Sequence, residues 1–477
     1  MSSVVKNIIW KFAERISSQT VSLVVSIILA RKLDPKDYGS IAMVMIFVSL
    51  ANVIVDGGFS SALIQKKNAD RLDFSTVFYF SLCFSIIIYF VLYLCAPLIV
   101  NFYGKDYEIL TPVLRVVGLQ IIISSINAVQ QAYISREMMF QKFFYSTLMG
   151  TCISALIGIV LAYGGYGIWA LVFQYLSSSI VNLITLYYLT KKLPALEFSF
   201  ARLKGLLNYG IKIFATTMLV QLYLQMRSLV IGKLYSAKDL AFFDRGRQFP
   251  CLLGDNINSS VGAVLFPKMS KEQDNIILLK DSTRKAIKFG SFIMCPMMLI
   301  FGAMSEPFVR FVLTEKWLPC VPLMQIFCVI YLFQPIHTAN MQAIKALGKS
   351  DVYFKLEMIK KVIELLCLLA VMQISVQAIA VNMAVLTTLF TFVNAFPNKK
   401  LLNYSFKEQM EDILPAVILS LITASVVWLV ILLSLPDFTT LVIQFVLGTI
   451  VYGLLSVLFK RENVLFLKDI LFNNIRR

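Results

Sequence analysis

The sequence predicts an all-α, polytopic membrane protein, and two observations carry that prediction. Of its 477 residues, 58% are hydrophobic and 15% are charged, and the mean hydropathy is +0.77. About fourteen apolar stretches of roughly twenty residues alternate with short basic hinges. Twenty residues of helix span about 30 Å, the thickness of a bilayer's hydrocarbon. Because that layer holds no water, each segment must satisfy its own backbone hydrogen bonds, which a helix does.

Taken in order along the chain, each apolar stretch predicts one helix. The clearest are residues 77–100, 417–433 and 441–458, which carry no charged side chain. The polar hinges between the stretches set the boundaries. We expect helices at residues 10–31, 40–60, 76–101, 109–133, 143–163, 166–189, 205–232, 243–266, 286–313, 320–344, 356–374, 376–396, 412–434 and 438–459.

Basic residues are distributed unevenly between alternate hinges. One set of hinges and termini holds 29 lysines and arginines, and the opposite set holds 10. Because cytoplasmic loops collect Lys and Arg, the excess predicts that both termini are cytoplasmic and that the number of helices is even. The net charge of +17 then follows from topology, and we expect no nucleic-acid partner. Part of the excess lies in the C-terminal tail, at Lys460, Arg461, Lys468, Arg476 and Arg477.

One short sequence occurs twice. Lys32–Asp37 follows the first predicted helix and Lys233–Asp239 follows the seventh, with one residue inserted. Internal repeats are typical of transporters, although a chance match of so short a motif is the alternative. A separation of six helices keeps the two copies in the same orientation. We therefore divide the chain into residues 1–195 with helices 1–6, residues 196–396 with helices 7–12, and residues 397–477 with helices 13–14 and a cytoplasmic tail.

Motifs of enzymes and metal sites are scarce. The single histidine, His337, has Gln334 and Asn340 nearby, which favours a hydrogen-bonded core or pore residue. The eight cysteines lie almost entirely in apolar runs without a CxxC pair, so they are interpreted as small hydrophobic residues. Gly348–Ser350 lacks the upstream glycine of a phosphate loop. We expect no metal, no cofactor and no enzymatic reaction.

Cationic side chains inside apolar stretches are costly and mark function by default. In the first predicted helix, Lys11 and Arg15 share a face, with Glu14 beside them. In the seventh, Lys212 and Arg227 share a face. Two cationic faces at equivalent places predict a shared water-filled cavity. The alternative is that the basic side chains reach the membrane surface and the polar residues bond between helices.

The eleventh predicted helix has a plainer charge pattern. Glu357 and Lys361 are four residues apart, and so are Lys360 and Glu364. Pairs at this spacing stabilise a helix without any further role. We therefore expect a structural function for these four residues.

Acidic side chains in the apolar stretches are few. Asp56 stands four residues after Asn52, and Asp255 is followed by Asn258. Because a membrane acid is by default a proton or cation site, Asp56, Asp255 and Glu14 are candidates for coupling to an ion. Simple hydration at a helix end is the alternative for Asp56. A cavity rich in cations and short of acids suits an anionic cargo, since guanidinium forks match phosphate oxygens.

Four sequence blocks occur in a characteristic order and spacing. They are Asp56–Gln65, Arg136–Phe140, Gly165–Gln174 and Phe266–Ser270. Together they resemble Wzx-type polysaccharide flippases, most of all the branch of colanic-acid and teichuronic-acid exporters. The resemblance implies the multidrug/oligosaccharidyl-lipid/polysaccharide exporter fold, with two six-helix lobes in a V and two C-terminal helices.

The same resemblance implies a function. Such proteins move undecaprenyl-diphosphate-linked oligosaccharide across the bacterial cytoplasmic membrane by alternating access, for O-antigen, capsule or exopolysaccharide synthesis. It implies membrane lipids, a polysaccharide polymerase and export machinery as partners, and action as a monomer. In related flippases cationic residues of the first helices of each lobe line the cavity. The positions here that match by helix and character are Lys11, Arg15, Arg227, Arg245 and Arg247.

Two other functions remain open at this point. A MATE-like drug or ion antiporter shares the fold but is expected to show a dominant acidic site in helix 1 or 7, whereas Glu14 has basic neighbours. A membrane polysaccharide polymerase is expected to carry a large extracytoplasmic loop, whereas the hinges of this chain are short.

Overall fold

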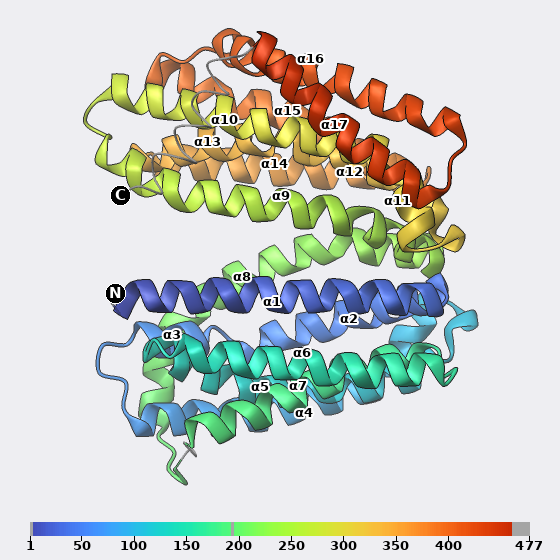
Figure 1. Cartoon of the computed structure of the whole chain (residues 1–477). Helices are drawn as coiled ribbons and strands as arrows, with labels where there is room; N and C mark the ends of the chain where they lie inside the picture. Colours follow the sequence, from blue (N-terminus) through green and yellow to red (C-terminus); the bar gives the residue numbers. More distant parts are fainter. Residues whose placement is uncertain (1–2, 192–194, 460–477) are drawn as a thin grey trace. The chain divides into compact units, whose positions relative to one another are not determined.

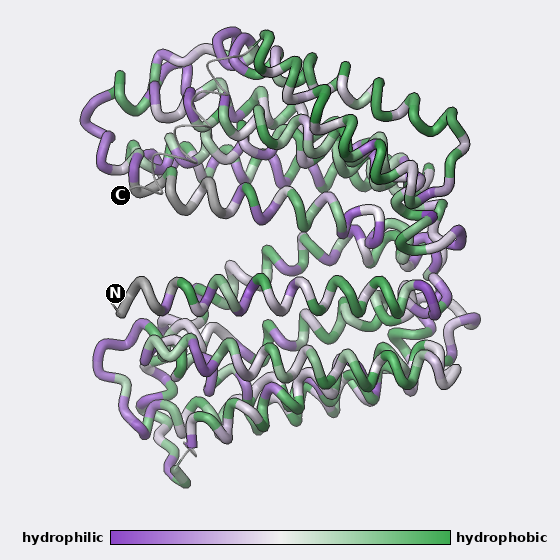
Figure 2. Tube along the Cα trace, viewed as in Figure 1, coloured by the Kyte–Doolittle hydropathy of each residue, from purple (hydrophilic) through white to green (hydrophobic). Residues whose placement is uncertain are grey.

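The computed structural model describes residues 3–191 and 195–459, and every regular element in these ranges is a helix (Figure 1). This confirms the all-α prediction. Eleven helical segments of the described ranges are long and apolar enough to cross a membrane. Apolar residues run along the middle of these helices, while polar residues gather at their ends and in the loops (Figure 2). The protein is therefore polytopic, and the total of fourteen spans stays a prediction.

The helices group into two compact units, residues 1–241 and residues 242–477. A 3-10 turn, η1 (Lys105–Tyr107), joins two helices of the first unit. The helices of the first unit are α1 (Ser3–Lys32), α2 (Pro35–Asp56), α3 (Phe59–Gln65), α4 (Arg71–Tyr103), α5 (Leu110–Arg136), α6 (Phe140–Tyr163), α7 (Ile168–Thr190) and α8 (Phe200–Leu234).

The second unit begins inside α9 (Ala237–Lys271). Its 3-10 turns are η2 (Glu315–Cys320) and η3 (Val430–Leu433). Its remaining helices are α10 (Ile276–Ala303), α11 (Ser305–Val312), α12 (Val321–Leu332), α13 (Gln334–Ala346), α14 (Ser350–Val371), α15 (Val376–Leu402), α16 (Phe406–Leu429) and α17 (Asp437–Phe459). The basic residues predicted for the tail, Lys460, Arg461, Lys468, Arg476 and Arg477, lie outside the described residues.

Three predicted helices are interrupted. The predicted helix 40–60 is α2 followed by α3, because Gly57 and Gly58 both adopt left-handed backbone angles, with φ of +52° and +76°. The predicted helix 320–344 is divided into α12 and α13, and Pro335 occupies the first turn of α13. Proline lacks the N–H that a continuous helix would use there. The predicted helix 286–313 corresponds to α10 and α11, which meet at Met304.

Helix α8 is held at both ends within the first unit. Near its start, Gly210 crosses the α2–α3 break so closely that a Cβ on Gly58 would lie 2.4 Å from the carbonyl oxygen of Gly210. Arg202 lies 3.2 Å from Asp70, the N-cap of α4. Near its end, Gly232 packs against the ring of Tyr103. The stretch between these contacts is largely exposed and carries the polar residues predicted from the sequence.

The two repeated motifs form the same local structure. In the first, Asp34 caps α2 and Asp37 bonds back to the cap in a capping box. In the second, Ser236 and Asp239 exchange hydrogen bonds of 3.1 and 3.2 Å at the start of α9. The two helix starts touch inside the first unit, where a Cβ on Gly39 would lie 1.6 Å from a backbone oxygen. The sequence repeat therefore corresponds to a structural repeat of helix starts.

In the second unit, α10 packs along α16 through three basic residues at four-residue spacing. Lys280 lies 2.8 Å from Glu408, and Arg284 and Lys288 lie 2.7 and 3.2 Å from Asp412. A second polar layer lies deeper, where amide side chains bond across α13, α15 and α16. It comprises the buried residues Asn340, Asn394, Asn398 and Gln409. These contacts hold α16 to the other helices of the second unit.

Candidate functional site

The charges of α1 are partly neutralised within the helix. The ammonium of Lys11 lies 3.0 Å from Glu14 and 4.3 Å from the ring centre of Phe143 on α6. Glu14 is only 8% exposed. Arg15 is exposed and forms no ion pair with another described residue. Of the two predicted cations, Arg15 is therefore the one with its charge open to a ligand.

The predicted cations of α8 differ in how they are held. Lys212 is exposed. Arg227 is half-buried, donates a hydrogen bond of 2.6 Å to the hydroxyl of Tyr223, and lies 5.0 Å from that ring's centre. Gln225, between them, donates a hydrogen bond to Ser49 of α2. Arg227 is thus pre-oriented by an aromatic neighbour, while a shared cationic face with Lys212 stays a prediction.

The two arginines of α9 have opposite surroundings. Arg245 is 5% exposed, donates a hydrogen bond to Gln248, and lies 5.3 Å from the ring centre of Trp317. Arg247 is exposed. Arg247 is thus available to a ligand, whereas Arg245 is enclosed by protein.

The predicted acids of α2 and α9 are both hydrogen-bonded. Asp255 accepts bonds of 3.1 Å from Gln334 of α13 and 3.0 Å from the thiol of Cys251. Asp56 accepts a bond of 2.5 Å from Ser60 and lines a cavity of about 170 Å³ within the first unit. The helical segment continues through α3 after Asp56, within one apolar span from Pro35 to Gln65.

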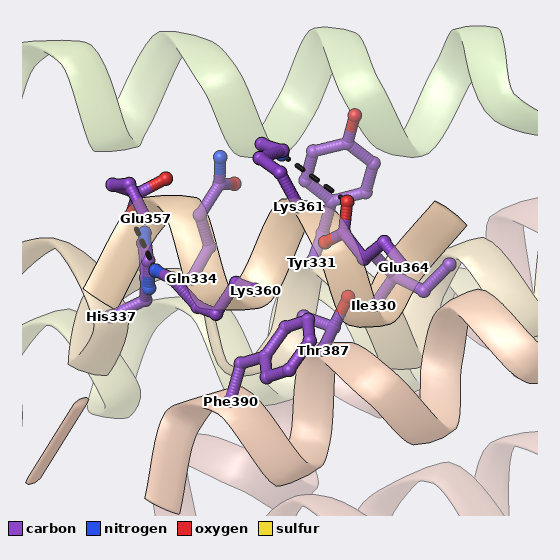
Figure 3. Close-up of a pocket in the computed structure, with 10 residues that line it drawn as sticks. All are labelled: Ile330, Tyr331, Gln334, His337, Glu357, Lys360, Lys361, Glu364, Thr387 and Phe390. Carbon is purple, nitrogen blue, oxygen red and sulfur yellow. Dashed lines mark hydrogen bonds and ion pairs between the residues drawn. The ribbon is translucent and has the colours of Figure 1, made fainter. Parts of the chain in front are cut away.

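A larger cavity of about 280 Å³ lies within the second unit, between α12, α13, α14 and α15 (Figure 3). Gln334, which bonds to Asp255, contributes to its wall, so the acid of α9 connects to this cavity. The charged and polar residues that line it are Tyr331, Gln334, His337, Glu357, Lys360, Lys361, Glu364 and Thr387.

Two ion pairs lie side by side in this cavity. Lys360, 4% exposed, contacts Glu357, and Lys361 lies 3.2 Å from Glu364. The pairs that form join residues three apart, whereas the sequence analysis predicted pairs four apart. His337 is half-buried, lines the cavity and is hydrogen-bonded to Asn394, which fits the predicted hydrogen-bonded core or pore residue. Both pairs neutralise charge where the dielectric constant is low.

Sequence reasoning did not assign this cavity, because each α14 pair can be explained by helix stability alone. The usable signal was the presence of two lysines and two glutamates in an otherwise apolar segment, which is rare without a functional reason. No cluster of three or more His, Cys, Asp or Glu side chains that could hold a metal ion occurs in the part of the chain that the structure describes.

The amino-acid sequence is similar to a known protein family and to individual proteins. A family model described as polysaccharide biosynthesis protein matches residues 28–322. The chain is 24% identical to the lipopolysaccharide biosynthesis protein WzxC of Escherichia coli K12 over 448 residues, covering 91% of this chain and 86% of WzxC. It is 22% identical to the teichuronic acid biosynthesis protein TuaB of Bacillus subtilis 168, covering 64% of this chain and 63% of TuaB.

A solved structure shares the fold. The lipid II flippase MurJ in an inward closed conformation superposes with a TM-score of 0.75 at 18% identity. The match covers 96% of this chain and all of the MurJ chain. This likeness confirms the predicted fold class.

Proposed function

The chain belongs to the polysaccharide biosynthesis protein family, and from that premise we propose that it is a flippase for lipid-linked oligosaccharides. The proposed cargo is an undecaprenyl-diphosphate-linked unit that crosses the bacterial cytoplasmic membrane for surface polysaccharide synthesis. The Wzx-type resemblance seen in the sequence is confirmed by the match to WzxC. The observation that supports an anionic cargo is the set of exposed cations, Arg15, Lys212 and Arg247, on helices α1, α8 and α9.

The proposed mechanism is alternating access, in which each unit offers exposed cations to the diphosphate. A guanidinium presents two parallel N–H donors to phosphate oxygens, and its charge acts more strongly where water is excluded. Arg15 and Arg247 have exposed guanidiniums, and Arg227 is oriented by Tyr223. Lys11 contributes less, because Glu14 already neutralises it. Arg245 acts through packing on Trp317.

The experiment that tests the cargo site is replacement of Arg15 and Arg227 in cells that depend on this protein for polymer export. Ala at either position should reduce export at least tenfold without lowering the amount of folded protein. Lys should restore only part of it, because the bidentate fork is lost. Lys67→Ala, which removes an exposed cation from a loop, is the matched control. Full export by the double Ala variant contradicts the proposal.

Orientation in the membrane follows from loop charge and is part of the proposal. Both termini are placed in the cytoplasm of a bacterium, because cytoplasmic loops collect Lys and Arg. A cysteine replacing Lys316 should then react with an impermeant reagent added to intact cells, and one replacing Lys400 should not. Reaction at position 400 reverses the topology.

The two alternative functions receive less support. A MATE-like antiporter needs a dominant acid on α1 or α8, and Glu14 of α1 is taken up by Lys11. A polymerase needs a soluble catalytic segment, and no loop between helices in the described ranges is long enough to fold as one. Polysaccharide polymerase and export machinery are instead proposed as the partners that receive the cargo. The division of the sequence at residues 195 and 396 and action as a monomer also remain proposals.

A further inference from the structure

Helix α2 ends inside a membrane-spanning segment. Asp56 is its last residue, Gly57 and Gly58 turn the backbone with positive φ, and Phe59 begins α3. The whole stretch from Pro35 to Gln65 is long and apolar enough to be one span. In membranes, a broken helix persists only where its freed backbone groups are buried in protein or face a polar cavity. Such breaks commonly hold the ion sites of transporters.

A cavity lined by both apolar and polar side chains lies at this break, within the first unit. Its volume is about 170 Å³, and its walls come from α2, α3, α4 and α5. That is below the roughly 300–1,000 Å³ of small-molecule pockets and equals the volume of about six water molecules. It therefore suits an ion and its waters. The polar residues that line it are Asn52, Asp56, Ser60, Ser81, Ser124 and Ser125.

The charges and partners of this cavity favour a cation. Asp56 is the one charged residue of the lining, and it forms no ion pair with a described residue. Ser60 donates its hydroxyl hydrogen to one carboxylate oxygen of Asp56. The side-chain oxygen of Asn52, one helical turn before Asp56, is buried without a hydrogen-bond partner among the described residues. Ser125 is already bonded to Ser85 at 3.0 Å.

We propose that this cavity binds a sodium ion through the carboxylate of Asp56, the side-chain oxygen of Asn52 and neighbouring serine hydroxyls. Carboxylate, amide and hydroxyl oxygens are the ligands preferred by hard metal ions. A single carboxylate favours a monovalent over a divalent ion, because divalent sites gain affinity from a higher ligand charge. The ion would supply the partner that Asn52 lacks. A role of this ion in driving transport rests on the proposed function.

Sodium binding can be measured on the purified protein in lipid nanodiscs without any transport. The midpoint of thermal unfolding is followed while NaCl replaces choline chloride at constant ionic strength and pH. Because a ligand that binds only the folded state stabilises it, the wild-type midpoint should rise with sodium and then saturate. Potassium should need at least tenfold higher concentration for the same rise.

Variants locate the site. Asp56→Asn should abolish the sodium response, and Asn52→Leu should raise the half-saturating concentration at least tenfold. Asp281→Asn removes a surface carboxylate paired with Lys285 and should leave the response unchanged. If Asp56→Asn does not fold, Ser60→Ala and Asn52→Leu test whether sodium binds in this cavity, because both variants retain the carboxylate of Asp56.

Three results overturn the sodium site. The first is a wild-type unfolding midpoint that does not rise and saturate with sodium. The second is a full sodium response in Asp56→Asn. The third is an unfolding midpoint that changes with pH through Asp56 but does not change with sodium. The last result assigns the cavity to a proton. Failure of polymer export in cells would contradict the proposed function but would leave the binding measurement standing, so the two ideas fail separately.

Discussion

The cavity at the α2–α3 break and the cavity beside α14 hold half-buried acids in opposite ways. In the first unit, Asp56 has a serine hydroxyl as its partner and no lysine or arginine lines the cavity. In the second unit, Glu357 and Glu364 each contact a lysine of the same helix. A carboxylate in a low-dielectric setting needs a compensating charge. In the second unit, lysines of the same helix supply that charge. In the first unit, no basic residue lines the cavity, so we expect an exchangeable cation to supply the charge at Asp56.

The largest expected effect is the loss of the α2–α3 break that shapes the first cavity. Gly58→Ala places a Cβ 2.4 Å from the carbonyl oxygen of Gly210, at a φ of +76° that L-residues adopt with strain. Backbone atoms cannot move aside cheaply. We expect a loss of about 5 kcal/mol or more, which amounts to loss of folded protein. Yield and size-exclusion behaviour after extraction measure it.

Gly205→Ala is the matched control for that change. Its Cβ would meet no atom within 4 Å, and it lies inside α8. Alanine there should raise stability by about 0.5–1 kcal/mol, because it restricts the unfolded chain and favours helix. Normal yield from Gly58→Ala would show that the break is not required, and the contrast between the cavities would lose its structural basis.

A smaller effect is expected from breaking one built-in pair of the second cavity. Glu357→Gln leaves Lys360, which is 4% exposed, without its carboxylate partner. Removing one member of a buried pair costs about 3–5 kcal/mol. Adding Lys360→Met removes the orphaned charge and should recover most of the loss. Thermal unfolding of the two single variants and the double variant gives the coupling energy.

The exposed pair Lys285–Asp281, with half of each side chain in contact with solvent, serves as the control cycle. Its coupling should lie near zero, at most about 0.5 kcal/mol. Equal coupling energies for Glu357–Lys360 and Asp281–Lys285 would mean that the second cavity is as well hydrated as the surface. The proposed difference between the lysine-paired acids of the second unit and Asp56 of the first would then not hold.

Hydropathy was sufficient to predict an all-α membrane protein, because about twenty apolar residues in a row are typical of a membrane span. The cationic side chains of α1 and α8 could be named from their helical spacing, while their place in a shared cavity stays a prediction. The break after Asp56 was predictable only as a turn. Two adjacent glycines indicate flexibility, but the crossing with Gly210, 152 positions away, decides that the break lies inside a span.

The cavity of the second unit could not be predicted, because its walls come from separate parts of the chain. Asn394 meets His337 across 57 positions, and Gln334 reaches Asp255 across 79. No local pattern encodes such contacts. The four-residue pairing predicted for α14 was wrong, because Lys360 and Lys361 each have a glutamate at three and at four residues and spacing alone does not choose between them. Burial of Lys360 next to Glu357 is what selects the three-residue pairing.

The smallest expected effect concerns Asp70, an exposed acid that lines neither of the two cavities. Hydrogen bonding by the backbone of Asp73 and the charge of Arg202 hold the pKa of Asp70 below its usual value. A lowered pKa in the folded state contributes stability above the unfolded value of about 4, and that contribution is lost as the pH falls further. Asp70→Asn keeps an N-cap residue of similar quality but removes the charge. The unfolding midpoint of this variant should lie about 1 °C or less below wild type at pH 7, because exposed pairs contribute little, and the gap should shrink as the pH falls below about 4. A gap that does not shrink at low pH would assign the effect to the cap, and a gap as large as that of Glu357→Gln would show that exposure does not separate these acids.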